Sequence, residues 1–188
     1  MGKPKLLLPW RKGLVIDAVL STWCASVDTV VVVMRRDDEA LANACRKHRV
    51  NIVQPSVDPP AMKESVIAAI EWISATREPD ERDAWLLAPA DQPRLNGKVI
   101  QELLAAHRQD WSSVKLPFVG GERGHPVLFP WSASRLLSTI PEDRGVNVLL
   151  EQLSVRKVVV ESPEILDDLD TPDDYQHLLD QDGESEPA

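Results

Sequence analysis

Apolar runs suited to buried strands alternate with segments of helical periodicity along this chain. The apolar positions from Leu14 to Trp23 recur at helical spacing, and the β-branched run over residues 29–34 has no polar interruption. Such a run predicts a strand buried on both faces, as in a sheet covered by helices. We expect further helices over 37–48, 62–75, 96–109, 132–140, 146–153 and 171–179, strands over 50–53, 85–88, 114–119 and 155–160, and a short apolar run at 127–129.

This alternation predicts an α/β fold with three layers, in which helices flank a mostly parallel, Rossmann-like sheet. A chain of 188 residues suits one core, so we expect a single domain over residues 1–180 and a disordered acidic tail over 181–188. Residues 120–126 are polar and rich in glycine, which predicts a flexible loop that carries binding groups. The sequence opens on a loop-like segment, whereas doubly wound sheets place their first strand in the middle. We therefore expect the first strand to be missing.

Composition narrows the classes of partner. The 21 Lys and Arg against 30 Asp and Glu give a formal net charge of −9, which disfavours nucleic acid and membrane surfaces. A small phosphorylated ligand could still be held by a local basic pocket. Because the chain has no apolar run long enough to span a bilayer and no signal-peptide pattern, we expect a cytoplasmic protein. Cys24 and Cys45 have no partner at metal-site spacing and are interpreted as ordinary buried thiols.

Carboxylates follow two of the predicted strands. Asp91 comes shortly after the strand at 85–88, and Asp167, Asp168 and Asp170 follow the strand at 155–160. Ligands of open α/β sheets bind beyond the carboxyl ends of the strands, and Mg²⁺ prefers a few carboxylates together with phosphate oxygens. The alternative is structural, because aspartates are also common in turns and at helix starts.

Basic and imidazole groups supply further candidates. Lys5 stands near Gly2 in the opening segment, where a flexible cation beside permissive backbone suits a phosphate, although an ordinary basic amino terminus would look the same. His125 lies in the glycine-rich segment and is either a ligand contact or a plain loop residue.

Several segments, taken together and in order, resemble the MobA-like nucleotidyltransferases. The segment M-G-K-P-K at 1–5 is similar to that family's M-G-x-x-K, D-Q-P at 91–93 to its D-Q-P turn, and D-L-D-T-P-D-D-Y at 168–175 to its D-I-D-T-P-E-D-Y ending. R-G-H-P-V-L-F at 123–129, E-D-R-G at 142–145 and the leucine pair at 149–150 resemble the molybdenum cofactor cytidylyltransferase branch. The matches span nearly the whole chain.

The resemblance implies a fold of the nucleotide-diphospho-sugar transferase type and a specific reaction. A nucleoside monophosphate, with CMP favoured, would pass from a nucleoside triphosphate to the terminal phosphate of molybdopterin, with release of pyrophosphate. The implied partners are therefore CTP and molybdopterin, and further a molybdoenzyme or its chaperone. Nucleotidyl transfer depends mainly on in-line positioning and on neutralisation of charge by metal ions and cations.

The resemblance also assigns residues. The implied catalytic residues are Lys5 and Asp91. The implied nucleotide-binding residues are Gly2, Lys5, Ser65 and Asp91. The implied Mg²⁺ ligands are Asp91 and Asp170, and the implied acceptor-binding residues are Arg123, Gly124 and His125.

Two departures from the family pattern change the expectation. Ala61 replaces a family glycine near the nucleotide base, and the glycine-rich loop that precedes M-G-x-x-K in the family is not in this sequence. We therefore expect Met1 to be an internal methionine of the true protein, with a strand and that loop encoded upstream. The alternatives left open are a related guanylyl or sugar-phosphate nucleotidyltransferase on the same fold, and a non-catalytic homologue that binds a nucleotide or a protein partner.

Overall fold

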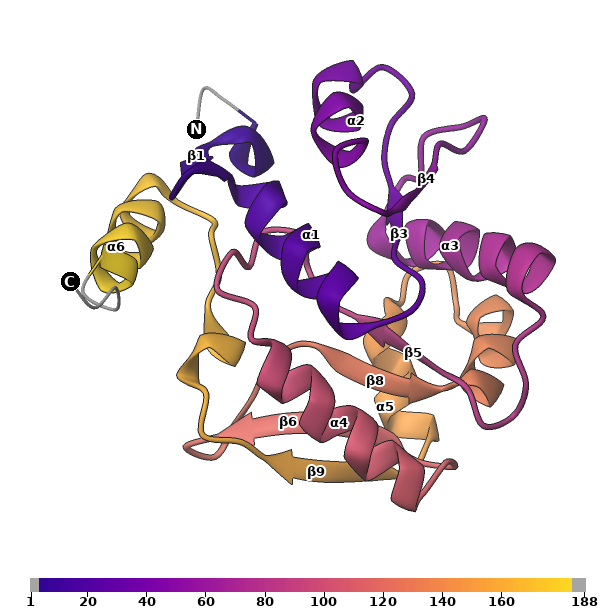
Figure 1. Cartoon of the computed structure of the whole chain (residues 1–188). Coiled ribbons are helices and arrows are strands. Elements are labelled where there is room, and N and C mark those ends of the chain that lie inside the picture. The colour runs from indigo at the N-terminus through magenta and orange to yellow at the C-terminus, as the bar shows by residue number, and fades with distance from the viewer. Residues whose placement is uncertain (1–3, 184–188) are drawn as a thin grey trace.

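The structure is a computed structural model that describes residues 4–183 (Figure 1). Its α-helices are α1 (Val15–Ser26), α2 (Glu39–Cys45), α3 (Met62–Arg77), α4 (Gly97–Gln109), α5 (Leu149–Gln152) and α6 (Pro172–Gly183). Its strands are β1 (Pro9–Trp10), β2 (Gly13–Leu14), β3 (Val31–Val33), β4 (Asn51–Val53), β5 (Ala84–Leu87), β6 (Val114–Val119), β7 (Glu122–Arg123), β8 (Val127–Pro130) and β9 (Val155–Val159). Short 3-10 helices are η1 (Lys5–Leu7), η2 (Trp131–Thr139), η3 (Val146–Val148) and η4 (Pro163–Leu166).

The larger sheet has five strands and is mixed. β8 pairs antiparallel with β5 on one side and with β6 on the other, while β6 and β9 pair in parallel. The α/β class is confirmed, but the sheet is less parallel than the sequence predicts. The reason is the short connection between β6 and β8, which has no room for a crossover helix and forms the hairpin strand β7 instead. Arg123 therefore lies in a strand and not in a flexible loop.

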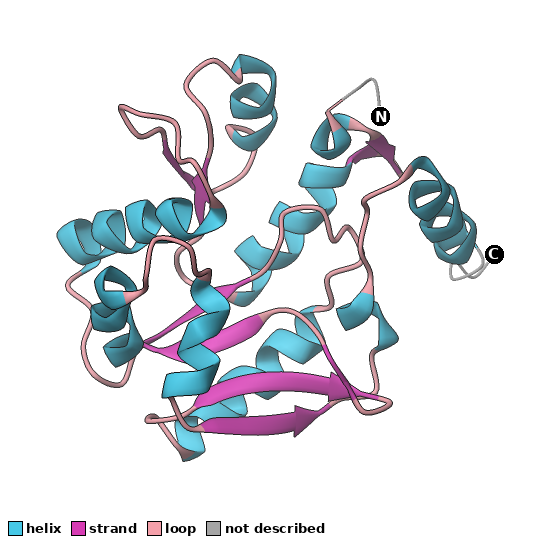
Figure 2. Ribbon diagram, turned by 180° about the vertical axis from the view of Figure 1, so that it is seen from behind, coloured by secondary structure: helices cyan, strands magenta, loops and turns pink. Residues whose placement is uncertain are grey.

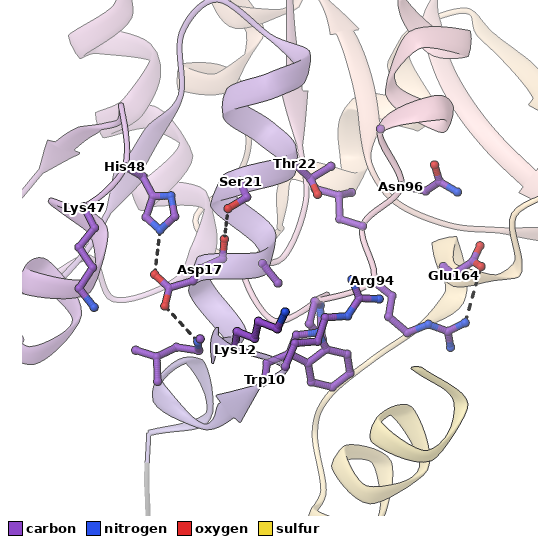
Figure 3. A pocket seen from close by; sticks show the side chains of 17 residues that line it. Trp10, Lys12, Asp17, Ser21, Thr22, Lys47, His48, Arg94, Asn96 and Glu164 are labelled. Atoms are coloured by element: carbon purple, nitrogen blue, oxygen red, sulfur yellow. Dashed lines mark hydrogen bonds and ion pairs between the residues drawn. The ribbon is translucent and has the colours of Figure 1, made fainter. Parts of the chain in front are cut away.

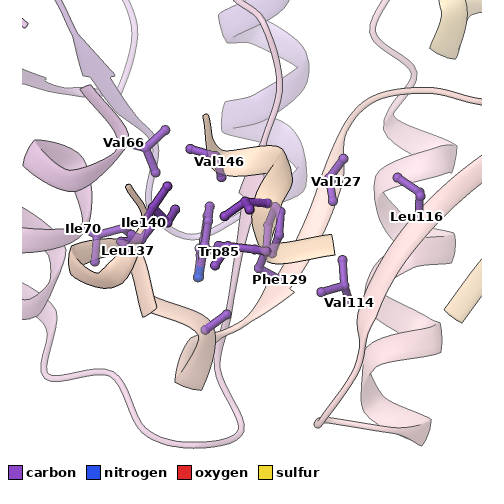
Figure 4. Packing of buried hydrophobic residues seen from close by; sticks show 13 residues of the cluster. Val66, Ile70, Trp85, Val114, Leu116, Val127, Phe129, Leu137, Ile140 and Val146 are labelled. Carbon is purple, nitrogen blue, oxygen red and sulfur yellow. The ribbon is translucent and has the colours of Figure 1, made fainter. Parts of the chain in front are cut away.

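Helices cover both faces of this sheet (Figure 2). Side chains alternate between the faces, so that Trp85 and Phe129 join the core under α3 and η2, whereas Leu128 joins the core under α4. The rings of Trp85 and Phe129 stack with their centroids 4.3 Å apart, at the centre of the larger cluster (Figure 4). This sheet is the stable platform of the molecule.

β3 and β4 form a separate, parallel, two-stranded sheet. α1 lies between the two sheets, since Ile16 and Leu20 pack into the cluster of the two-stranded sheet while Val19 packs against Leu95 and Ile100 (Figure 1). Within residues 4–183, no strand joins β3 to β5. This arrangement agrees with the expectation that the middle of the sheet lacks a strand.

Helix starts follow the sequence signals. The Asp38 side chain accepts from the Leu41 N–H at the start of α2, and the Asn96 side chain accepts from the Lys98 N–H at the start of α4. At α6 the Thr171 hydroxyl accepts from the Asp174 N–H while the Asp174 carboxylate accepts from the Thr171 N–H, which makes a reciprocal cap.

Other boundaries differ from the expectation. The hairpin β1–β2 precedes α1, and residues 132–139 belong to the 3-10 helix η2 and not to an α-helix. α6 continues through Gly183, so residues 181–183 are helical and not part of a disordered tail, while 184–188 lie outside the described residues. α6 rests against the hairpin through a hydrogen bond from the Tyr175 hydroxyl to the Pro9 carbonyl. None of the helices in the described chain has the length and apolarity needed to cross a membrane.

Candidate metal and phosphate site

Three segments that are far apart in sequence bring one ammonium and three carboxylates together. Lys5 comes from η1, Asp91 from the turn after β5, and Asp168 and Asp170 from the extended segment before α6. The Lys5 Nζ forms an ion pair with the Asp91 Oδ2 and donates to the Asp170 Oδ1 at 3.0 Å. One carboxylate oxygen from each of the three aspartates lies within 4.8 Å of the others. The described residues therefore hold a compact acidic cluster with a cation at its centre.

The charges in this cluster influence one another. Burial raises the pKa of Asp168 above its usual value, and the neighbouring carboxylates of Asp170 and Asp91 raise it further, partly offset by Lys5. Burial by itself would lower the pKa of Lys5, but its hydrogen bonds with Asp91 and Asp170 leave that pKa raised. The ammonium thus stays charged, and three carboxylates against one ammonium leave an excess of negative charge.

The cluster fits a divalent cation. The Asp91 Oδ1 is buried and has no hydrogen-bond partner within residues 4–183. A buried carboxylate oxygen without a donor is costly, and a metal ion bound there would satisfy it. Aspartate oxygens are hard ligands of the type that Mg²⁺ and Mn²⁺ accept. Asp91, Asp168 and Asp170 could therefore hold a metal, and Lys5 could bind a phosphate beside it.

Buried contacts fix the two loops that carry the carboxylates. The Gln92 side chain donates to the Asp167 carbonyl at 2.8 Å, which joins the turn after β5 to the acidic segment. Arg94 lies 3.5 Å from the Asp167 carboxylate and 3.6 Å from that of Glu164. Burial raises the pKa of Asp167 to about 6, with Arg94 opposing the shift. Asp167 thus points into these contacts and away from the cluster formed by its neighbours.

The proposed acceptor residues Gly124 and His125 touch the segment that leads into the acidic cluster. The His125 N–H donates to the Ile165 carbonyl at 3.0 Å, and a Cβ on Gly124 would lie only 2.3 Å from that same oxygen. Burial lowers the pKa of His125, with the Leu87 carbonyl and the carboxylates of Asp168 and Asp91 offsetting part of the shift. Glycine at 124 is therefore required by the close approach of the two loops.

Two other candidates inferred from the sequence, Arg123 and Ser65, come from separate elements of the fold. Arg123 is exposed on β7. Ser65 lies in the first turn of α3 and lines a groove between β3 and β5, and Gly2 lies outside the described residues. The sequence places Asp168 among the candidate carboxylates, but the resemblance assigns only Asp91 and Asp170 to the metal, although the alternation in D-L-D places residues 168 and 170 on the same side of an extended chain.

A second, more polar cleft of about 760 Å³ lies beside the hairpin β1–β2 (Figure 3). The Asp17 carboxylate there pairs with His48 at 2.8 Å and accepts from the Leu14 N–H at 3.0 Å, so that it also caps α1. None of the candidate residues inferred from the sequence is among those that line this cleft in the described chain.

An α/β sheet with an acidic cluster beyond a strand end and a lysine among the carboxylates is an arrangement that could bind a metal ion and a phosphate. The chain belongs to the family of the MobA-like NTP transferase domain, whose model matches residues 1–158. Members of this family are nucleotidyltransferases. The family resemblance, the fold class and the enzyme class expected from the sequence are therefore confirmed.

Similar proteins agree with this assignment. The chain is 25% identical over 180 residues to a molybdenum cofactor cytidylyltransferase of Escherichia coli (strain K12). The aligned region covers 93% of this chain and 86% of that protein. A nucleotidyl transferase from Methanothermobacter thermautotroptrophicus superposes with a TM-score of 0.76 at 23% identity, over 97% of this chain and 86% of that one. The manganese complex of Rv0371C from Mycobacterium tuberculosis H37Rv superposes with a TM-score of 0.72 at 22% identity, over 95% and 93% of the two chains.

Proposed function

We propose that this nucleotidyltransferase acts in molybdenum cofactor biosynthesis and transfers CMP from CTP to the terminal phosphate of molybdopterin, with release of pyrophosphate. The observation that carries the proposal is the cluster of Lys5, Asp91, Asp168 and Asp170, because nucleotidyl transfer needs a seat for a divalent metal beside a cation for the triphosphate. The preference for cytidine and molybdopterin is supported by the curated relative from E. coli.

Each group of residues in the proposed site would have its own role in the reaction. Asp91 and Asp170 would hold Mg²⁺, with Asp168 as a third carboxylate, and a relative of the same fold has been crystallised with manganese. When bound, the metal would neutralise charge that develops on the phosphates. Lys5 would bind triphosphate oxygens, since its ammonium already lies among the carboxylates and its pKa is raised. Arg123, Gly124 and His125 would face the acceptor, and Ser65 and Gly2 the nucleotide.

Pyrophosphate release tests the transfer directly. CTP, GTP, UTP and ATP are supplied one at a time with molybdopterin, with Mg²⁺ or with a chelator in its place. We expect release with CTP and Mg²⁺ and none with the chelator. Release with GTP alone would replace the nucleotide in the proposal by guanosine. Failure with all four nucleotides, combined with failure of the protein to bind Mn²⁺ in an electron paramagnetic resonance titration, would overturn the proposed metal-dependent transfer.

A further inference from the structure

The polar cleft beside the hairpin β1–β2 is enclosed by segments that are far apart in sequence (Figure 3). Its lining comes from the turn of the hairpin, from α1, from Lys47 and His48 after α2, and from the segment at 93–97 that leads into α4. Its volume of about 760 Å³ lies in the range of small-molecule sites, roughly 300–1,000 Å³. Neither Lys5 nor Asp91 lines it, so within the described chain this cleft is separate from the acidic cluster.

Basic residues outnumber acidic ones in the lining of this cleft. Within residues 4–183, four of the charged lining residues are basic and two are acidic: Arg11, Lys12, Lys47 and Arg94 against Asp17 and Glu164. The whole chain, in contrast, has a formal net charge of −9. The charge of the cleft is therefore opposite in sign to that of the molecule, and an excess of positive charge in a concave site attracts anions.

Both acidic residues of the cleft already have partners. The Asp17 Oδ1 lies 2.8 Å from the His48 Nε2, and its Oδ2 accepts from the Leu14 N–H at 3.0 Å. The Glu164 carboxylate lies 3.6 Å from the Arg94 guanidinium. These contacts hold the two carboxylates within the wall of the cleft, so they do not neutralise its lysines.

The two lysines of the cleft are cations that a ligand could use. Lys12 and Lys47 are exposed, and their ammonium groups have no hydrogen bond or ion pair within residues 4–183. Figure 3 shows Lys47 and Arg94 on opposite sides of the cleft with Lys12 between them. An ammonium on a flexible stem carries three donors and is a common partner of phosphate oxygens. Donors for a phosphate group are therefore present in the cleft.

The hairpin turn holds Lys12 beside the cleft in an unfavourable backbone conformation. Trp10 pairs with Gly13 across the hairpin, so Arg11 and Lys12 are the two central residues of the turn. Arg11 has a φ of 48°, which lies in the left-handed region that glycine favours. The Trp10 side chain is 2% exposed and packs in one cluster with Leu169, which anchors the turn. Backbone strain of this kind is concentrated at functional sites, and here it presents two adjacent cations.

The rest of the lining suits a polar ligand. Ser21, Thr22 and Asn96 supply hydroxyl and amide groups. α4 begins at Gly97, which also lines the cleft, so the positive end of the helix dipole adds to the attraction for an anion. A small polar molecule that carries a phosphate group would therefore meet cations at one end and neutral polar groups along the remainder.

We propose that the cleft beside β1–β2 is a second anion site of this protein, and that it binds a small, polar phosphate ester without a metal ion. The ammonium groups of Lys12 and Lys47 would donate to the phosphate oxygens. The acidic cluster would repel the same ligand when no metal is bound, because its three carboxylates outnumber the single ammonium of Lys5. Independence from metal thus separates this site from that of the proposed nucleotidyl transfer, and either proposal can fail without the other.

A nuclear magnetic resonance titration of the isotope-labelled protein tests the site. The protein is first freed of metal with a chelator that is then removed, and glycerol 3-phosphate is added at constant ionic strength. At millimolar concentration of this probe we expect saturable shifts in the backbone amide signals of Lys12, Gly13, Lys47 and His48, and none at Asp91. Malonate should bind more weakly, because its two charges lie on separate groups.

Two matched double variants test the lysines. Lys12→Gln with Lys47→Gln should weaken the binding of glycerol 3-phosphate at least about tenfold, because both charge-assisted contacts are lost. Arg156→Gln with Lys157→Gln removes two exposed cations from β9, changes the net charge equally and should change the affinity less than about twofold. All four side chains are exposed, so both variants should keep the signal dispersion of the folded chain.

Several results would overturn the proposal. An equal loss of affinity in the two double variants would mean a general attraction to the surface and not a site. Titration of the unsubstituted protein decides independently of the variants, because shifts that do not saturate, or saturable shifts confined to the neighbourhood of Asp91, would exclude the cleft. Equal affinity for malonate would exclude the phosphate group as the feature that is recognised.

Discussion

The two sheets of this molecule have similar apolar strands in very different surroundings. All residues of β8 are buried, because β8 has a neighbouring strand on each side and helices above and below. All residues of β3 are only half-buried, although each is a valine. The difference shows that burial of a strand depends on whether both of its edges are paired, and that composition alone does not set it. The acidic cluster joins the two regions, since Lys5 directly precedes Leu6 and Leu7, which pack against the core of the two-stranded sheet, and Asp91 follows β5 of the five-stranded sheet.

The largest loss of stability should come from truncating a buried side chain of the five-stranded sheet. Phe129 is buried and stacks on Trp85, so Phe129→Ala should lower the free energy of unfolding by about 3–5 kcal/mol. The matched change in the two-stranded sheet, Val32→Ala, should cost roughly 1 kcal/mol because that side chain is half-buried. Urea denaturation measures both. Equal losses would show that the two sheets are equally well packed.

A nearly equal effect, on function and not on stability, should follow from Asp91→Ala. Asp91 belongs to a turn and would contribute charge to the proposed metal site, so its loss should reduce nucleotidyl transfer by at least a hundredfold, about 3 kcal/mol, with little change in the unfolding midpoint. Affinity for Mn²⁺ should fall in parallel, which a paramagnetic resonance titration detects. Asp37→Ala removes an exposed carboxylate elsewhere and serves as the control. Unchanged transfer in Asp91→Ala would remove this residue from the proposed site.

An intermediate effect is expected at the one lysine that the five-stranded sheet encloses completely in the described chain. Lys115 on β6 is 0% exposed, and its Nζ donates to the carbonyls of Asp110 and Ser113 and to the Ser113 hydroxyl. Burial lowers the pKa of this lysine. Lys115→Met would leave those acceptors without a donor, so unfolding should become easier by about 1–3 kcal/mol, as urea denaturation would measure. A gain in stability would instead show that the methionine packs better than the charge.

The smallest expected effect is a change in how the stability of the fold depends on pH. Hydrogen bonds from Ser113 and Ser112 hold the pKa of Asp110 well below its ordinary value of 3.8. A carboxyl group whose pKa is lower in the folded than in the unfolded chain stabilises the fold above about pH 4 and loses that contribution as the pH falls further. The urea midpoint of the wild-type chain should therefore drop more between pH 5 and pH 3 than that of Asp110→Asn. Identical slopes would mean that Asp110 does not contribute.

Much of the element order could be predicted because the periodicity signal was strong. The valine run of β3 falls within the strand predicted over 29–34, and α2 and α4 begin close to the starts of the helices predicted over 37–48 and 96–109. The hairpin β1–β2 was not predicted, since Leu14 continues the apolar period of α1 and hides the turn. The antiparallel course of β8 follows from the tight turn at Gly120 and Gly121, both with positive φ, whereas the glycine-rich composition of residues 120–126 predicts only a flexible loop.

The candidate site divides in the same way. The sequence indicates Lys5, Asp91 and Asp170, and the structure brings these three side chains together from the beginning, the middle and the end of the chain. The turning away of Asp167 could not be predicted, because it depends on Arg94, which lies far away in sequence and pairs with Asp167. Asp168 could have been added to the site from the alternation in D-L-D, which places it on the same side as Asp170. Ser65 was placed with the nucleotide from the resemblance, while in the structure it lines the groove between the sheets. Local pattern thus identifies the chemistry, and tertiary contacts select among adjacent carboxylates.

The close approach of Gly124 to Ile165 leaves no space for a side chain at position 124. Asp168 and Asp170 follow Ile165 by three and five residues. A displacement of the Ile165 carbonyl would therefore shift the short stretch of backbone that bears both carboxylates. Any side chain at position 124 would displace the Ile165 carbonyl and could shift these two carboxylates relative to Asp91. Glycine at position 124 therefore helps to set the position of the two carboxylates through the backbone of the neighbouring segment.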